Sequence, residues 1–190
     1  MTASGIYRHV LEEIARALGE NGGAAAAVDL LHERLDRYSW VGFYRVEGDE
    51  LVLGPWRGPR ATPHVRIPIG EGICGAAAAS GATEVVDDVA ADSRYLACFP
   101  STRSEIVVPV VRDGRVVGEI DIDSDRPGAF DDGDRTFLEQ VVRLLALADD
   151  DPSLAADGVV DEWGRGSFPA SDPPARWAGP DVPATVPTRS

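Results

Sequence analysis

Residues 106–122 read IVVPVVRDGRVVGEIDI. Two runs rich in β-branched residues, Ile106 to Val111 and Val116 to Ile122, stand on either side of the turn Arg112-Asp113-Gly114. Asp-Gly between two such runs is the strongest short-range signal for a β-hairpin, because both residues adopt a positive φ readily. The stretch therefore predicts two antiparallel strands, and it favours an antiparallel sheet for the domain around them.

Further strand signals lie upstream of this hairpin. They are Trp40 to Val46, Leu51 to Trp56, His64 to Ile69 and Glu84 to Val86. The first two form a second hairpin through Glu47-Gly48-Asp49, and a short Ala-rich helix at Gly75 to Ala79 precedes the last one. Residues 88–103 carry no periodic pattern, so we expect irregular chain there.

Helical patterns flank the strands on both sides. Residues 4–20 place Ile6, Val10, Ile14 and Leu18 on one stripe, and 24–37 reads as a second helix. A last helix is expected from Asp131 or Asp132 to about Ala148, with an acidic first turn that suits the helix dipole. This order predicts one α+β domain over 1–148, with N-terminal and C-terminal helices packed on a central antiparallel sheet.

Residues 149–190 differ from the domain in composition. They hold half of the 14 prolines and many Asp, Ala and Ser, and they show no apolar periodicity. Such a composition is typical of a disordered tail. The segment SFPASDPP at 167–174 is a candidate docking motif through which the chain would act on a regulatory partner, although a solvated tail is the favoured interpretation.

The charge balance excludes several partners. The formal net charge is −14, the pI is near 4.5, and all 18 basic residues are Arg. An excess of acid argues against nucleic acid and against an anionic membrane surface. The absence of Lys excludes Schiff-base chemistry and a P-loop.

The expected compartment follows from the first 20 residues and from the cysteine count. Glu12, Glu13 and Arg16 interrupt the apolar positions near the N-terminus, which argues against a secretory signal, and no stretch is long enough to span a bilayer. We therefore expect a cytoplasmic protein with reduced thiols. Two cysteines in that compartment favour redox chemistry or plain packing over a structural disulfide.

Cys74 and Cys98 are these two cysteines. Cys74 lies in Gly70-x-Gly72-x-x-Gly75, which matches the dinucleotide fingerprint, but the following helix is too short and no second nucleotide-binding half follows. The glycines more plausibly allow a sharp turn that places Cys74 in the first helical turn, where free amides favour a thiolate. Two Cys and three scattered His lack paired ligand spacing, so no metal site is expected.

Acidic residues alternate along the last predicted strand. Glu119, Asp121 and Asp123 share one face because side chains alternate across a strand. A solvated sheet face is the simple interpretation, but three like charges in a row repel unless a cation or a shared proton relieves them. Trp40 and Tyr44 share a face of the first strand with Gly42, either as plain core or as the wall of an apolar pocket whose floor the glycine leaves open.

Taken together, these motifs resemble the GAF-domain free methionine-(R)-sulfoxide reductases. The resemblance covers about residues 5–148 and rests on motifs that occur in the family's order, with a similar 24-residue interval between the two cysteines. The motifs are Trp40-Val41-Gly42-Phe43-Tyr44, Gly70-Glu71-Gly72-Ile73-Cys74-Gly75, Ala97-Cys98, Ser104-Glu105-Ile106-Val107-Val108-Pro109 and Asp121-Ile122-Asp123-Ser124.

The resemblance implies a role for each candidate site residue. Cys98 would attack the sulfoxide sulfur, Cys74 would form a disulfide with the resulting sulfenic acid, and reduced thioredoxin would restore both thiols without a bound cofactor. Acidic side chains would hold the substrate ammonium and protonate the sulfoxide oxygen, and aromatic ones would enclose the methyl end. The acidic residues are Glu105, Asp121 and Asp123, and the aromatic ones are Trp40 and Tyr44.

Two positions depart from the family pattern. His64 stands where family members often carry a further, resolving Cys, so resolution falls to Cys74 or to an external thiol. Phe99 follows the nucleophile, where the family usually has Asp. Since GAF domains also serve as ligand sensors, a non-catalytic module that binds a small molecule or senses oxidants is the alternative function. GAF domains often pair through their terminal helices, which makes a homodimer a further expectation.

Overall fold

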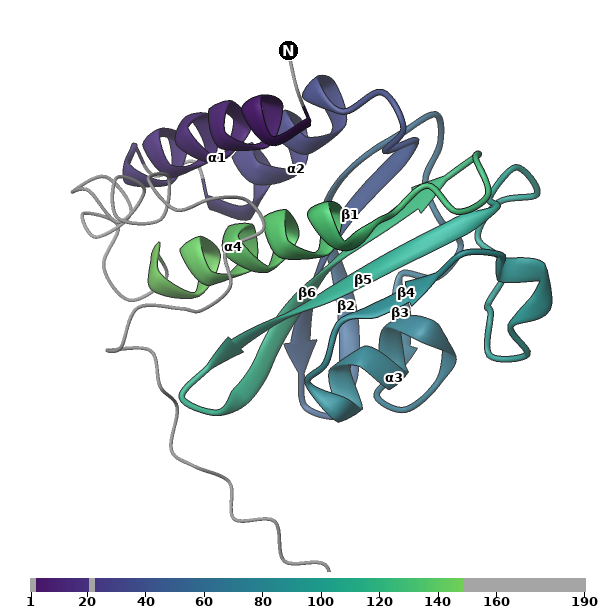
Figure 1. The fold of residues 1–190 in the computed structure, drawn as a ribbon. Coiled ribbons are helices and arrows are strands. Elements are labelled where there is room, and N and C mark those ends of the chain that lie inside the picture. The colour runs from purple at the N-terminus through teal and green to yellow at the C-terminus, as the bar shows by residue number, and fades with distance from the viewer. Residues whose placement is uncertain (1–2, 21–22, 149–190) are drawn as a thin grey trace, which may run out of the picture.

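The computed structural model describes residues 3–20 and 23–148 (Figure 1). One six-stranded sheet has the order β3-β2-β1-β6-β5-β4, with every neighbouring pair antiparallel. Its strands are β1 (Trp40–Glu47), β2 (Glu50–Arg57), β3 (Arg66–Pro68), β4 (Glu84–Val86), β5 (Ser104–Arg112) and β6 (Arg115–Ser124). The predicted α+β class and central antiparallel sheet are confirmed.

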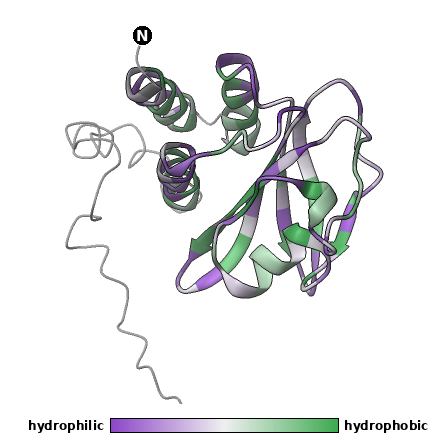
Figure 2. Ribbon diagram, turned by 45° about the vertical axis from the view of Figure 1, so that its right-hand side comes forward, coloured by the Kyte–Doolittle hydropathy of each residue, from purple (hydrophilic) through white to green (hydrophobic). Residues whose placement is uncertain are grey.

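Helices cover both faces of this sheet. In the described part of the chain they are α1 (Ala3–Gly19), α2 (Gly23–Arg34), α3 (Gly72–Ser80) and α4 (Asp132–Ala148), with a 3-10 turn at Val89–Ala91. The terminal helices α1, α2 and α4 lie side by side on one face, and α3 lies on the other. Figure 2 shows these three helices close to end-on, across the sheet from α3.

The hairpin of β5 and β6 is built as its sequence predicts. Arg112 pairs with Arg115, so the loop has two residues, Asp113 and Gly114, with φ of 50° and 72°. Both residues thus have the positive φ that the tightest hairpin turns require. Alternate residues of the two strands, such as Ile106 and Ile120, are fully buried under the terminal helices.

Some predicted boundaries are wrong, and each has a local cause. The second helix ends at Arg34 rather than 37, because the next residues turn toward α4, where Arg37 and Tyr38 donate hydrogen bonds to Asp134. The third predicted strand shortens to Arg66–Pro68. The Ala-rich helix begins at Gly72, three residues earlier than expected, and so includes Cys74.

The terminal helices are joined by one buried carboxylate. Asp134 accepts hydrogen bonds from the hydroxyls of Tyr7 and Tyr38 and from the Arg37 guanidinium. Its second oxygen accepts the Asp131 amide, while the Asp131 side chain accepts the Asp134 amide, which is a reciprocal cap on the first turn of α4. This network ties α1, the segment before β1 and α4 together.

Two further expectations concern the tail and a membrane-spanning segment. The tail at 149–190, with its predicted disorder and its SFPASDPP motif, lies outside the described residues. In the described part of the chain, no helix combines the length and the apolar character that crossing a membrane requires.

Candidate active site

The predicted acidic residues face α3, on the side of the sheet away from the terminal helices. Side chains alternate along β6, so Ile120 and Ile122 enter the helix-side core while the acids point the other way. Strand register aligns them with their neighbours. Between β1 and β6 the pairs are Trp40 with Asp123, Gly42 with Asp121, and Tyr44 with Glu119. Between β5 and β6, Glu105 pairs with Asp123.

The acids are buried, so the interpretation of a solvated face is wrong. Glu119 is 0% exposed, Asp121 and Asp123 are each 2% exposed, and Glu105 is 5% exposed. Both oxygens of Glu119, both of Asp123 and Oδ1 of Asp121 lack a well-formed hydrogen bond, although the Cys74 thiol lies near Glu119 and Asp121, and Thr102 lies near Asp123. Buried charge without a counter-charge is costly, so these groups need protons or a cation.

Burial shifts the acids toward their neutral forms. It raises the pKa of Asp121 from 3.8 to about 7. It also raises the pKa of Glu105, Glu119 and Asp123, and in each case the nearby charge of Asp121 adds to the effect. Near neutral pH the cluster therefore holds protons that it can donate, which ordinary surface carboxylates cannot do.

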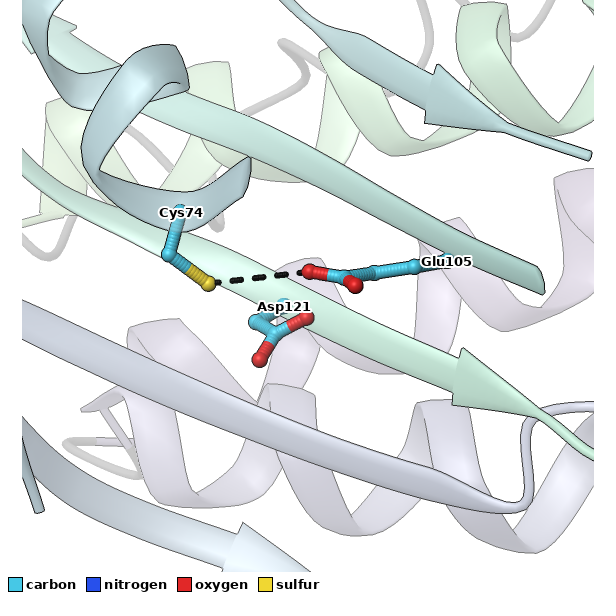
Figure 3. A group of neighbouring side chains, drawn as sticks. All are labelled: Cys74, Glu105 and Asp121. Atoms are coloured by element: carbon cyan, nitrogen blue, oxygen red, sulfur yellow. Dashed lines mark hydrogen bonds between the residues drawn. The ribbon is translucent and has the colours of Figure 1, made fainter. Parts of the chain in front are cut away.

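Cys74 reaches the same cluster from the first turn of α3. Its Sγ donates to Glu105 Oε1 at 3.8 Å, with Asp121 beside them (Figure 3). Burial and the surrounding carboxylates raise the pKa of the Cys74 thiol well above its usual range. The expectation that the helix start favours a thiolate is therefore wrong in this state, because desolvation and three acidic neighbours oppose it.

The glycines around Cys74 allow the sharp turn into α3, as the sequence predicted. Gly72 has φ of 70°, a backbone conformation that side chains disfavour. A Cβ at Gly75 would lie 2.6 Å from the Pro68 carbonyl oxygen and 2.9 Å from the Gly70 nitrogen. The motif thus brings the chain close enough to pack α3 directly against the end of β3.

Cys98 lies beside the acids on the irregular chain before β5. It is half-buried, and its Sγ lies 3.5 Å from the Leu96 carbonyl oxygen. Burial raises the pKa of the Cys98 thiol, with further increases from Asp121 and Asp123, while a hydrogen bond from the Thr62 hydroxyl lowers it. The structure therefore brings both thiols to one carboxylate cluster, although they stand 24 residues apart in sequence.

The aromatic residues form a wall next to Cys98. Trp40 stacks on Trp56 with ring centroids 6.4 Å apart and meets Phe99 at 6.0 Å. A Cβ on Gly42 would lie 2.2 Å from the Trp40 ring, so the indole itself fills the space above this glycine. Of the two interpretations of this strand face, the one with an open floor at Gly42 is wrong, because the indole occupies that space.

Tyr44 also lies on this face. Its side chain is fully buried, and its hydroxyl donates to the His64 carbonyl oxygen at 2.9 Å. The His64 ring nitrogen Nε2 lies 3.4 Å from the Ala97 carbonyl oxygen, so His64 neighbours the segment that carries Cys98. Tyr44 thus connects β1, through His64, to the chain that carries Cys98.

Three residues near the thiols were not among the predicted site residues. Glu119 has the most enclosed carboxyl group, Thr62 hydrogen-bonds to Cys98, and Phe99 contacts Trp40. Strand alternation already placed Glu119 on the acidic face and could have included it. Thr62 carries no comparable signal, because it lies 36 residues before Cys98 in chain without a periodic pattern.

A hollow of about 500 Å³ lies on the helix side of the sheet. Phe43, Val110 and Leu145 line it, with Arg45 and Arg115 among its polar residues. Neither cysteine nor any residue of the acidic cluster borders it. The thiol and acid chemistry therefore belongs to the α3 side of the sheet.

The fold and this arrangement agree with the comparisons to known proteins. The sequence pattern of the GAF domain matches residues 2–148. The chain belongs to the GAF domain family. Within that family it is related to the free methionine-R-sulfoxide reductases, at about 40% identity.

Individual relatives show how far the similarity extends. The free methionine-R-sulfoxide reductase of Escherichia coli K12 is 44% identical over 116 residues, which are 61% of this chain and 69% of that protein. A solved structure of the Neisseria meningitidis enzyme in complex with its substrate has 38% identity and a TM-score of 0.74, covering 82% of this chain and 95% of that one. GAF domain-containing protein A of Dictyostelium discoideum is 36% identical over 143 residues, 73% of this chain and 89% of that protein.

Proposed function

We propose that the protein reduces free methionine-(R)-sulfoxide to methionine with Cys98 as nucleophile and Cys74 as resolving thiol. The observation that carries the proposal is the position of both thiols against one cluster of buried carboxyl groups, with the Cys74 Sγ 3.8 Å from Glu105 Oε1. The relationship to free methionine-R-sulfoxide reductases supports the substrate class. A thiol and an acid in one site are what sulfoxide reduction requires.

The cluster supplies the counter-charge that a free amino acid needs. An ammonium group taken out of water needs carboxylate partners. Glu105, Asp121 and Asp123 are buried, and Asp121 and Asp123 have oxygens without a well-formed hydrogen bond. One of them would ionise against the ammonium while another keeps its proton. The wall of Trp40, with Tyr44 behind it, would enclose the methyl end of the substrate.

The first chemical step oxidises Cys98 to a sulfenic acid. A protonated carboxyl of the cluster donates to the sulfoxide oxygen, which makes the sulfur electrophilic, and the Cys98 sulfur attacks after a carboxylate accepts its proton. A bond forms between the Cys98 sulfur and the substrate sulfur while the sulfur–oxygen bond breaks, and the protonated oxygen leaves as water. Water then attacks the Cys98 sulfur and loses a proton to a carboxylate, the sulfur–sulfur bond breaks, methionine leaves as the thioether, and Cys98 is left as a sulfenic acid. The substrate gains two electrons and Cys98 loses two.

The second step restores the enzyme. Cys74 attacks the Cys98 sulfur, a disulfide forms, and the sulfenic oxygen leaves as water. The Cys74 proton can pass to Glu105, whose Oε1 lies 3.8 Å from Sγ. Reduced thioredoxin then supplies two electrons and two protons, which regenerate both thiols.

A turnover assay with separated epimers tests the proposal. The full chain with a dithiol or thioredoxin system should consume the free R-epimer and leave the S-epimer, and Cys98→Ser should reduce the rate to background. Cys74→Ser should perform one turnover and retain a Cys98 sulfenic acid that a dimedone-type probe labels. Turnover that survives Cys98→Ser, or consumption of neither epimer, would overturn the assignment.

The alternative function is a GAF module that binds a small molecule or responds to oxidants without turnover. A solved structure that is 37% identical to this chain carries the name of a GAF sensor protein, which supports this alternative. It predicts that free methionine sulfoxide or another small molecule raises the melting temperature of the full chain. The same shift should remain after Cys98→Ser, with no methionine released.

A further inference from the structure

We propose that Cys74, Glu105 and Asp121 form a binding site for a thiophilic divalent cation such as Zn²⁺. The proposal goes beyond the proposed reductase activity, although it places the cation in the same cluster of side chains. The expectation of no metal site rested on ligand spacing along the sequence. Here the three ligands come from α3, β5 and β6, which meet only in the folded chain.

The geometry fits a small tetrahedral ion. The Cys74 Sγ and one carboxyl oxygen each of Glu105 and Asp121 all lie within 4.8 Å of one another, and Figure 3 shows the three side chains converging. Sγ and Glu105 Oε1 are 3.8 Å apart. Zinc bonds of about 2.3 Å to sulfur and 2.0–2.2 Å to oxygen place tetrahedral ligands roughly 3.5 Å apart, so a small contraction completes the site.

The buried carboxylate oxygens of the cluster are a second observation that favours a cation. Both oxygens of Glu119 and Oδ1 of Asp121 are buried without a well-formed hydrogen bond, and the Cys74 thiol lies close enough to both groups to lower their pKa. Across residues 3–20 and 23–148, the ion pairs formed by Arg and His residues involve none of the four acids of the cluster. Glu119 lies two residues before Asp121 on the same face of β6, outside the group of three whose ligand atoms lie within 4.8 Å, so a water molecule or a shifted Glu119 side chain would complete the tetrahedron.

The ligand set selects the class of metal. Ca²⁺ takes six to eight oxygen ligands and Mg²⁺ prefers oxygen in octahedral geometry, whereas thiolate favours Zn²⁺ and similar ions. A cation would replace the protons that the cluster otherwise holds, because zinc binds the thiolate and the ionised carboxyls. Binding therefore releases protons and strengthens as the pH rises.

The site predicts inhibition of the proposed reaction. A metal on Cys74 withholds the sulfur that resolves the sulfenic acid. The same ion occupies the carboxylates that would hold the substrate ammonium, so metal and substrate exclude each other. Free zinc would then switch off turnover without oxidising either cysteine.

Cobalt titration tests the site without any sulfoxide. The reduced, chelator-treated full chain should bind one equivalent of Co²⁺ and develop a sulfur-to-cobalt charge-transfer band that Zn²⁺ abolishes. Cys74→Ser and Cys74→Ala should lose the band, and Cys98→Ser should keep it. Glu105→Gln should weaken binding about tenfold or more, by the scale of supporting interactions at metal sites.

Defined results overturn the proposal. They are no charge-transfer band with the full chain, or a band that survives both Cys74 variants and vanishes in Cys98→Ser. Circular dichroism of the variants separates lost binding from lost folding, and if neither Cys74 variant folds, Glu105→Gln and Asp121→Asn decide the result. Because no sulfoxide is present, failure here leaves the reductase proposal standing, and an inactive reductase leaves this result valid.

Discussion

At the scale of single residues, Asp121 shows how burial sets the chemistry of the cluster. Its carboxyl lies on β6 beside the Cys74 thiol, the residue is 2% exposed, and burial raises its pKa from 3.8 to about 7. The same burial that makes it a usable acid must weaken the fold when the group ionises. Stability and acidity at this position are therefore two measurements of one free energy.

Asp121→Asn should stabilise the protein at pH 8 and change little at pH 4. Between pH 3.8 and about 7 the native state keeps a proton that the unfolded chain has lost, so the free energy of unfolding falls as the pH rises through this window. The neutral amide removes that loss, on the order of a few kcal/mol at pH 8. Urea unfolding at both pH values measures it.

Asp125→Asn is the matched control for this measurement, because Asp125 is exposed just after β6. It should change the free energy of unfolding by less than about 0.5 kcal/mol at either pH. Equal effects of the two substitutions at pH 8 would contradict a raised Asp121 pKa.

Thr62 carries the second prediction at this scale. Its hydroxyl hydrogen-bonds to Cys98 and lowers the pKa of that thiol against the effect of burial. In a Cys74→Ser background, Thr62→Val should shift the pH profile of Cys98 alkylation upward. A shift of one unit slows alkylation about tenfold at pH 8, since only the thiolate reacts.

Thr62→Ser keeps the hydroxyl and serves as the control for that profile. It also keeps the oxygen that accepts the His64 amide at 3.1 Å. If the Val and Ser variants alkylate at the same rate, the hydroxyl does not assist Cys98.

At the scale of elements, the parts that were predictable are those with local signals. Asp113-Gly114 specified a two-residue turn, and alternation in β6 placed Glu119, Asp121 and Asp123 on one face. Burial of that face depends on α3 and on the chain around Cys98, which pack over it from elsewhere in the sequence. Periodicity in β6 alone could not distinguish this from a solvated face.

Two errors at the site have the same origin. The pKa of Cys74 depends on acids from β5 and β6, which outweigh the effect of its own helix start. The space above Gly42 is filled by Trp40, a neighbour on the same strand face whose ring orientation no pattern specifies. How side chains from different elements contact each other depends on packing. The sequence motifs therefore predicted which residues lie at the site but not how their side chains are placed.

Gly75 offers a test of how α3 is seated. In an exposed helix Gly→Ala gains about 1 kcal/mol. At Gly75 the added Cβ would lie 2.6 Å from the Pro68 oxygen, so Gly75→Ala should instead destabilise by about 1–3 kcal/mol. Displacement of the helix start should also slow formation of the Cys74–Cys98 disulfide on oxidation, measured by thiol counting.

Ala79→Gly provides the comparison on the same helix. Ala79 is exposed, so the substitution should cost about 1 kcal/mol in stability through helix propensity alone. Disulfide formation should then proceed at the rate of the unsubstituted chain. Equal rates for both variants would show that seating of α3 does not govern the approach of the two thiols.

At the scale of the whole molecule, the sheet separates the α3 side, which carries the candidate site, from the side covered by the terminal helices. The α3 side carries the thiols and the buried acids, and the acid oxygens without a well-formed hydrogen bond oppose stability. The helix side holds an apolar core and the Asp134 network, in which one buried carboxylate accepts from Tyr7, Arg37 and Tyr38. A site with buried, poorly satisfied acids needs such a scaffold, because native proteins have only about 5–15 kcal/mol to lose.

Asp134→Ala should therefore destabilise the protein by about 3–5 kcal/mol, because it removes the buried acceptor that Arg37 and the hydroxyls of Tyr7 and Tyr38 share. Tyr7→Phe removes one donor and should cost about 1 kcal/mol. Since the network lies across the sheet from both thiols, the turnover of each folded molecule should be unchanged below the melting transition. Urea unfolding and the sulfoxide assay on the same samples separate the two sides of the sheet, and reduced turnover in fully folded Asp134→Ala would show that they are coupled.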